Sequence, residues 1–185
     1  MWLSFRSRFA KTWLRNNRGS AAVEFALVAV PFFMLLFGIV IIGLYFFTSH
    51  ALENGVESAA RKIRTGEAQK SEVTVAAFKQ LVCADAGSYI DCNKLRVVLQ
   101  SAEKWGDITP QPCVDGQGQV ASSTGAGGEK ISKYTGDASQ VVLVTLCYQW
   151  DLAQSFSFLN LGANSDGSGP AIIPAAVAFR TEPYS

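Results

Sequence analysis

GSAAVEFALVAVPFFMLLFGIVIIGLYFF, residues 19–47, contains an uncharged run of 23 residues from Phe25 to Phe47. An α-helix rises ~1.5 Å per residue, so a run of this length can cross a hydrocarbon core of about 30 Å with some tilt. We therefore expect a transmembrane span over residues 25–47. The carboxylate of Glu24 stands at the threshold of this span, where an ionised group needs a partner or access to water.

The residues before the span predict its direction. Positions 1–19 carry no acidic residue but five basic ones, namely Arg6, Arg8, Lys11, Arg15 and Arg18. Because positive charge is retained on the cytoplasmic side, we expect a single-pass protein with its N-terminus in the cytoplasm and everything after the span exported.

The helix is expected to continue beyond the membrane as an amphipathic segment. Leu52, Val56, Ala59 and Ile63 recur at helical spacing, and Gly66 is a stop signal. This predicts one long helix over residues 20–65. Residues 66–185 are then long enough for one small exported head with its own core.

The head has the pattern of an α+β domain. Ser71 is a candidate cap for a short helix through Val82, and strands are expected at 95–102, 141–150 and 175–180. The second strand is apolar on both faces, which is typical of a central strand. We expect an antiparallel sheet of about three to four strands, with loops at 110–136 and 162–174. Residues 151–161 are ambiguous between a short helix and irregular structure.

The cysteines indicate disulfides in an oxidising compartment. All four follow the span and none belongs to a C-x-x-C element, which disfavours a zinc site. Of the three possible connectivities we favour Cys83 with Cys92 and Cys113 with Cys147, because the first pair flanks the turn-like stretch ADAGSYID. The other two connectivities remain open at this point.

Enzyme and nucleic-acid-binding classes receive no support from the sequence. His50 is the single histidine, and no phosphate-binding loop or metal-ligand spacing is present, so we expect no catalytic residues, no cofactor and no metal. Without residues 1–19 the chain would hold 11 basic and 15 acidic residues, a formal charge of −4, which gives no footprint for nucleic acid.

Two segments carry a resemblance to a known family. A basic leader ending in Gly19, four residues, then Glu24 and Phe25 resemble the prepilin processing pattern. The stretch RGSAAVEFALVAVPFFMLLFGIV and, more weakly, the ending FRTEPY are similar to the TadE/TadG-like family. Its members are minor pilins, or pseudopilins, of the tight-adherence (Tad, Flp) pilus system. Whether the chain is of the TadE, TadF or TadG type stays open.

The resemblance implies a structural role in the biogenesis or assembly of a Tad pilus. It implies cleavage between Gly19 and Ser20, and a role for Glu24, with Phe25 and Pro31, in placing the helix among other pilin helices. The implied location is the bacterial inner membrane, with the head in the periplasm or on the pilus. The implied partners are a prepilin peptidase, the major pilin, other minor pilins, and the inner-membrane platform with its ATPase.

Two alternatives accompany this interpretation. Glu24, one turn inside the span, could simply reach the cytoplasmic headgroup region. The whole chain could be an uncleaved bitopic membrane protein, whose exported domain binds an envelope ligand or serves as a secretion scaffold. The N-terminal residue of the membrane-extracted protein separates the two classes, since Ser20 indicates processing and Met1 indicates none.

Overall fold

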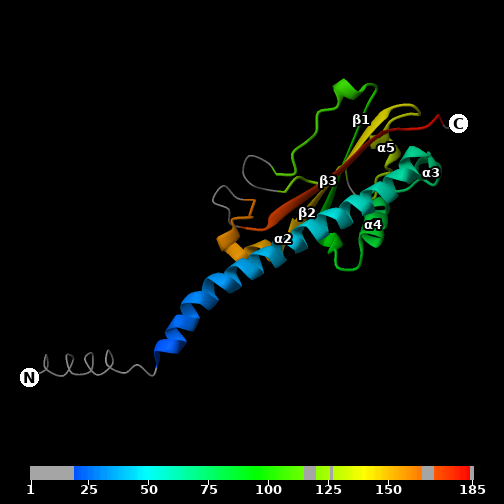
Figure 1. The fold of residues 1–185 in the computed structure, drawn as a ribbon. Helices are drawn as coiled ribbons and strands as arrows, with labels where there is room; N and C mark the ends of the chain where they lie inside the picture. Colours follow the sequence, from blue (N-terminus) through cyan, green and yellow to red (C-terminus); the bar gives the residue numbers. More distant parts are fainter. Residues whose placement is uncertain (1–18, 115–119, 126, 164–168, 184–185) are drawn as a thin grey trace, which may run out of the picture. The chain divides into compact units, whose positions relative to one another are not determined.

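The computed structural model describes residues 19–114, 120–125, 127–163 and 169–183 (Figure 1). Residues 1–18 of the predicted leader, which runs from 1 to 19, lie outside these described residues. The chain divides into two compact units, one ending at Gly43 and the other beginning at Leu44. The helices are α2 (Ser20–Arg64), α3 (Glu67–Lys70), α4 (Val75–Ala86) and α5 (Ser132–Thr135), and the 3-10 turns are η2 (Cys92–Lys94), η3 (Trp105–Asp107) and η4 (Asp151–Leu159). The strands are β1 (Leu95–Ala102), β2 (Val141–Trp150) and β3 (Ala171–Arg180).

Helix α2 confirms the predicted long N-terminal helix. It continues through Pro31, and an 18-residue window within it has a mean hydropathy of 2.9, which makes the helix long and apolar enough to span a membrane. The helix ends at Arg64, and Gly66 then adopts a φ of 74°. This left-handed conformation is one that glycine adopts at little cost, which explains the stop predicted there.

The first helix of the head begins later than predicted. Ser71 does not cap it, because the amide of Ser71 donates to the Glu67 carbonyl (2.9 Å) and thereby closes the short helix α3. The cap of α4 is Thr74, whose hydroxyl accepts a hydrogen bond from the Ala77 amide (3.2 Å). The expected helix over 71–82 is therefore corrected to Val75–Ala86.

The three strands form one antiparallel sheet in the order β1-β2-β3, which confirms the predicted fold class and the central position of β2. In the register, Val144 of β2 lies opposite Leu99 of β1 and Val177 of β3. The last strand is longer than predicted, because it begins at Ala171 and not at Ala175. The segment expected as a loop over 110–136 likewise contains α5.

Pro174 explains why β3 was expected to begin late. Thr181 follows the last residue of β3, and its amide donates to the Gln140 carbonyl (2.9 Å), just before β2. Because backbone groups alternate in direction along an antiparallel strand, the odd-numbered residues of β3 direct their N–H and C=O groups toward β2. Pro174, opposite Cys147, falls among the residues directed outward. A proline there removes no hydrogen bond of the ladder, and an edge strand tolerates it.

The core of the head lies between the sheet and the helices α2 and α4, which Figure 1 shows side by side against it. The predicted apolar stripe of α2 is fully buried, namely Leu52, Val56, Ala59 and Ile63. At Gly55 the two helices approach so closely that an added Cβ would lie 2.8 Å from the Val82 carbonyl oxygen and 2.9 Å from the Ala86 Cβ. Gly55 therefore permits the contact between α2 and α4.

Candidate assembly helix and processing site

Gly19 stands directly before the first residue of α2. It is exposed, its φ is not in the left-handed region, and a Cβ added there would meet no atom within 4 Å. The fold of the described residues therefore imposes no requirement for glycine at this position. A requirement for glycine there would come from another molecule that binds this segment.

Glu24 lies on the same face of α2 as the residue that would become the new N-terminus. The Ser20 hydroxyl donates a hydrogen bond to the Glu24 carboxylate (2.9 Å), and both side chains are exposed. Among the residues that the structure describes, no cation pairs with Glu24. The carboxylate thus remains accessible to a cation supplied by cleavage or by another subunit.

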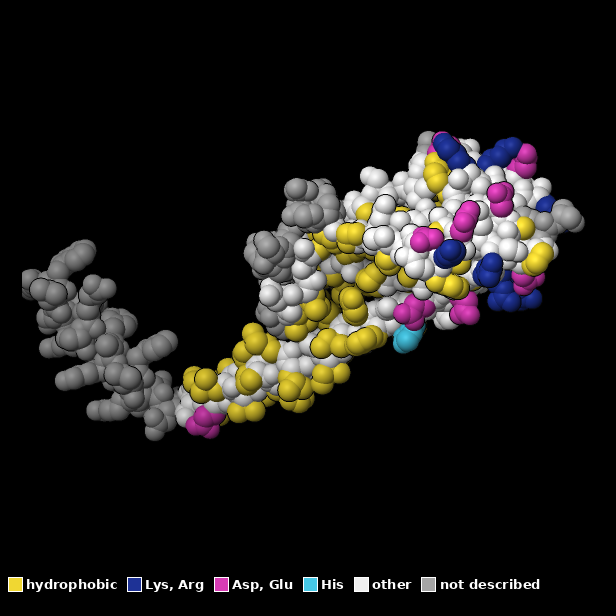
Figure 2. Space-filling view, turned by 90° about the horizontal axis from the view of Figure 1, so that it is seen from above, with side chains coloured by type: hydrophobic (Ala, Val, Ile, Leu, Met, Phe, Trp, Pro, Cys, Tyr) yellow, Lys and Arg dark blue, Asp and Glu magenta, His cyan; other side chains and the backbone are white. Residues whose placement is uncertain are grey.

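The apolar half of α2 is exposed almost throughout. Phe25 is 70% exposed and Pro31 is also exposed. Figure 2 shows apolar side chains along this part of the helix, whereas most charged side chains gather on the head. A continuous apolar surface of this kind is typical of a segment covered by lipid or by other helices. One exposed helical segment therefore contains all three predicted positions, Glu24, Phe25 and Pro31, and they do not form a pocket together.

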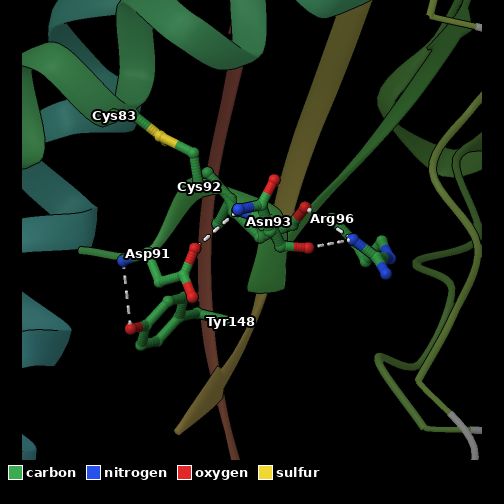
Figure 3. The surroundings of a disulfide bond; sticks show 7 residues. Cys83, Asp91, Cys92, Asn93, Arg96 and Tyr148 are labelled. Atoms are coloured by element: carbon green, nitrogen blue, oxygen red, sulfur yellow. Dashed lines mark hydrogen bonds between the residues drawn. A yellow bond between two sulfur atoms is a disulfide. The ribbon is translucent and has the colours of Figure 1, made fainter.

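The first disulfide joins Cys83 of α4 to Cys92 of η2 (Figure 3). The connection is supported by two hydrogen bonds of Asp91. Its carboxylate accepts from the Asn93 amide (3.0 Å), and its amide donates to the Tyr148 hydroxyl (3.4 Å). The turn between the two cysteines is thereby fixed to the central strand as well as to α4.

The second disulfide joins Cys113 to Cys147, which is fully buried in β2. Both bonds follow the connectivity favoured from the sequence, and the described cysteines include no free thiol. Because side chains alternate along a strand, Cys147 lies on the sheet face opposite to its neighbours Leu146 and Tyr148. The bond therefore holds the segment around Cys113 on the face away from α2 and α4.

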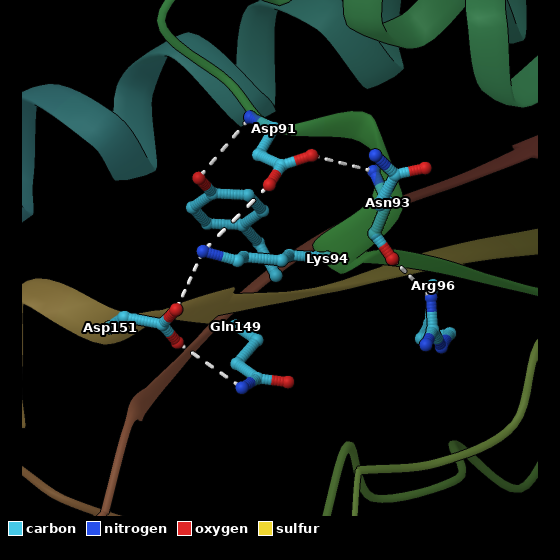
Figure 4. Close-up of polar contacts among 7 residues, drawn as sticks. Asp91, Asn93, Lys94, Arg96, Gln149 and Asp151 are labelled. Carbon is cyan, nitrogen blue, oxygen red and sulfur yellow. Dashed lines mark hydrogen bonds and ion pairs between the residues drawn. The ribbon is translucent and has the colours of Figure 1, made fainter.

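A cluster of charges lies where β1 begins and β2 ends (Figure 4). The Lys94 ammonium is 2.6 Å from the Asp151 carboxylate and 3.7 Å from that of Asp91. The hydrogen bond from Lys94, with a second from Gln149, lowers the pKa of Asp151 below its ordinary value, and the same bond to Asp151 raises the pKa of Lys94. Both ion pairs are solvated, and the one between Lys94 and Asp151 joins two distant chain segments, for which the sequence contains no local signal.

In the part of the chain that the structure describes, no three or more His, Cys, Asp or Glu side chains gather where they could hold a metal ion. His50 is exposed, and its Nδ1 lies 3.1 Å from the Glu53 carboxylate one turn along α2. The described residues thus combine an exposed apolar helix with a disulfide-bonded head.

A comparison with known protein families matches residues 19–61 to the family described as TadE-like protein. The match begins at Gly19 and includes Ser20, Glu24, Phe25 and Pro31. It ends within the amphipathic part of α2, three residues before the helix ends. Neither the curated proteins nor the solved structures contain a match to the chain.

Proposed function

Because the chain carries a TadE-like segment at residues 19–61, which associates it with the Tad pilus, we propose that it is a minor-pilin-like subunit for the biogenesis or assembly of that pilus. The observation that carries the proposal is a coincidence of boundaries. The family match begins at Gly19, helix α2 begins at Ser20, and the apolar run begins at Phe25. A processing site, a new N-terminus and a membrane helix thus follow each other within seven residues.

In this function α2 inserts the chain into the bacterial inner membrane with the N-terminus inside. A prepilin peptidase then cuts between Gly19 and Ser20. The exposure of Gly19 and the free space around it support this step, because a protease must reach the peptide bond from solvent or from the membrane surface. The disulfide-bonded head agrees with export, since disulfides persist in oxidising compartments.

Cleavage would create a cation for Glu24, which has none among the described residues. The new ammonium group would be carried by Ser20, whose side chain already reaches the Glu24 carboxylate. A carboxylate at the edge of a hydrocarbon core favours such a partner, either in its own chain or in a neighbouring pilin helix. Pairing between neighbouring helices would set their relative height in an assembly.

The role is structural, with no catalytic activity of its own. The proposed partners are the prepilin peptidase, the major pilin, other minor pilins and the inner-membrane platform. The exposed apolar half of α2 supports helix-to-helix contacts with other pilins, because it offers a large surface that no described residue of the chain covers beyond a few positions.

The test is the N-terminus and intact mass of the membrane-extracted protein from cells that contain the peptidase. The proposal expects an N-terminal Ser20 and, for Gly19→Leu, a chain about 2 kDa heavier that keeps residues 1–19. The matched control is Ala22→Leu, which adds the same side chain to an exposed position three residues later. An N-terminal Met1 in the wild-type protein would instead support the uncleaved bitopic alternative.

A further inference from the structure

Two rings of α2 contact aromatic side chains from distant parts of the chain. Tyr45 meets Trp150, the last residue of β2, with ring centroids 5.8 Å apart. Phe47 meets Tyr89, in the connection after α4, with centroids 5.2 Å apart. Residues two apart on a helix point about 200° apart, so the head contacts α2 from opposite sides at this level.

These contacts belong to a larger apolar group, which we call the aromatic rim. It consists of Tyr45, Phe46, Phe47, Tyr89 and Leu152. Trp150, whose ring meets Tyr45, is only 7% exposed and supports the rim from within the head. Phe46 and Phe47 are each 58% exposed, Tyr89 is 51% exposed and Leu152 is 39% exposed. Large apolar side chains of the described head are thus exposed to solvent beside Tyr45–Phe47 of α2.

The position of the rim along α2 identifies what covers it. Residues 45–47 are the last three of the uncharged run that begins at Phe25, so they fall at the outer boundary of the expected span. Tyr89 and Trp150 touch this segment and therefore lie at the same depth. Tyrosine is enriched at membrane–water interfaces, where an apolar ring and a polar tip are both satisfied, and the half-exposed Tyr89 fits this preference.

One charged residue that adjoins Trp150 and Leu152 in the chain is already paired within the protein. Asp151 stands between Trp150 and Leu152 in the chain, and the Lys94 ammonium lies 2.6 Å from its carboxylate. An ion pair is easier to place beside the headgroup region than an isolated carboxylate would be.

We propose that the aromatic rim rests in the interfacial region of the outer leaflet of the membrane that α2 spans. This proposal rests on the membrane insertion in the proposed function. It assigns Tyr89 and Leu152, which lie far from the span in sequence, to the same membrane interface as the end of the span.

The test uses single introduced cysteines in the full chain, because all described native cysteines are in disulfides. Ser88→Cys reports on the rim and leaves Tyr89 intact, Phe33→Cys reports on the span, and Glu67→Cys lies beyond the far end of α2 as the control. Each thiol carries an environment-sensitive fluorophore, in vesicles of phosphatidylethanolamine and phosphatidylglycerol. Quenchers are doxyl groups at shallow or deep positions of the lipid chains, and aqueous iodide.

The expected result has three parts. The label at position 33 should be quenched by deep doxyl groups. The label at position 88 should be quenched by shallow doxyl groups several-fold more strongly than the label at position 67. Only the label at position 67 should be fully accessible to iodide. Adding Tyr89→Asp to the Ser88 variant should reduce its shallow quenching, because the charge opposes burial in the interface.

Three results would overturn the proposal, and they differ in whether the membrane insertion of α2 fails with it. If Phe33 is quenched but Ser88 behaves like Glu67, the head stands away from the bilayer while insertion holds. If Phe33 is not quenched by lipid, insertion fails and this proposal with it. If Ser88 is shielded from iodide without doxyl quenching, and the shielding grows with protein density, another protein copy covers the rim.

Discussion

Removing one disulfide at a time should destabilise the head by unequal amounts. The Cys113–Cys147 bond closes a separation of 34 residues and the Cys83–Cys92 bond one of 9 residues. The chain-entropy relation assigns about 3.8 kcal/mol to the longer closure and about 2.6 kcal/mol to the shorter one at 25 °C. The double variants Cys113→Ala with Cys147→Ala, and Cys83→Ala with Cys92→Ala, are matched in chemistry and test this difference.

The structure adds a local reason for the same order. The segment after Cys113 contacts β1 through hydrogen bonds of Ser123 and Thr124, among them the Thr124 amide, which donates to the Val97 carbonyl (2.8 Å). When its disulfide is lost, the turn before Cys92 keeps the hydrogen bond from the Asp91 amide to the Tyr148 hydroxyl on the central strand, and the local bond from the Asn93 amide to the Asp91 carboxylate. Amide exchange at Thr124 should therefore accelerate in the Cys113 and Cys147 variant alone.

The assay is urea unfolding of the full chain in detergent micelles, followed by near-ultraviolet circular dichroism, with hydrogen exchange measured by mass spectrometry. The unmodified chain should retain no free thiol at the four positions. An equal loss of unfolding free energy in both variants, or a larger loss for the short bridge, would refute the argument from loop length. Free thiols in the oxidised wild-type protein would refute the pairing itself.

Three further outcomes are expected. Glu24→Ala should insert as well as the wild type but appear less in pili, measured by crosslinking to other pilins, and normal crosslinks would remove its proposed pairing role. Gly55→Ala should lower the unfolding free energy by roughly 1–2 kcal/mol, because the clash of the new Cβ with α4 outweighs the gain in helix propensity. Gly43→Ala is the control and should not lower it, because a Cβ at Gly43 meets no atom within 4 Å. Val177→Pro should cost ~1–3 kcal/mol by breaking a ladder hydrogen bond, whereas Ala178→Pro, directed outward like the native proline of β3, should cost much less; similar losses would contradict the register.

Local sequence signals were sufficient where the physical cause is itself local. The spacing of Leu52, Val56, Ala59 and Ile63 and the glycine at 66 act over a few residues, and the predictions of a buried stripe and a helix end are confirmed. The uncharged run forms the predicted long apolar helix, while the membrane span itself stays a prediction. The alternating pattern of β1 and the continuous apolar run of β2 likewise form the predicted strands. The errors arose where two local signals competed. Ser71 closes one helix and does not open the next, and Pro174 is compatible with a strand only at an outward position of its edge.

The sequence by itself determined an apolar helix long enough to span a membrane, a small α+β head, and a segment at residues 19–61 that matches the TadE-like family. The tertiary structure decided which distant residues meet. The contact of Gly55 with α4, the ion pair of Lys94 with Asp151, and the rings of Tyr89 and Trp150 beside α2 join segments tens of residues apart. Such contacts depend on the path of the chain between the segments, and no short sequence pattern encodes that path.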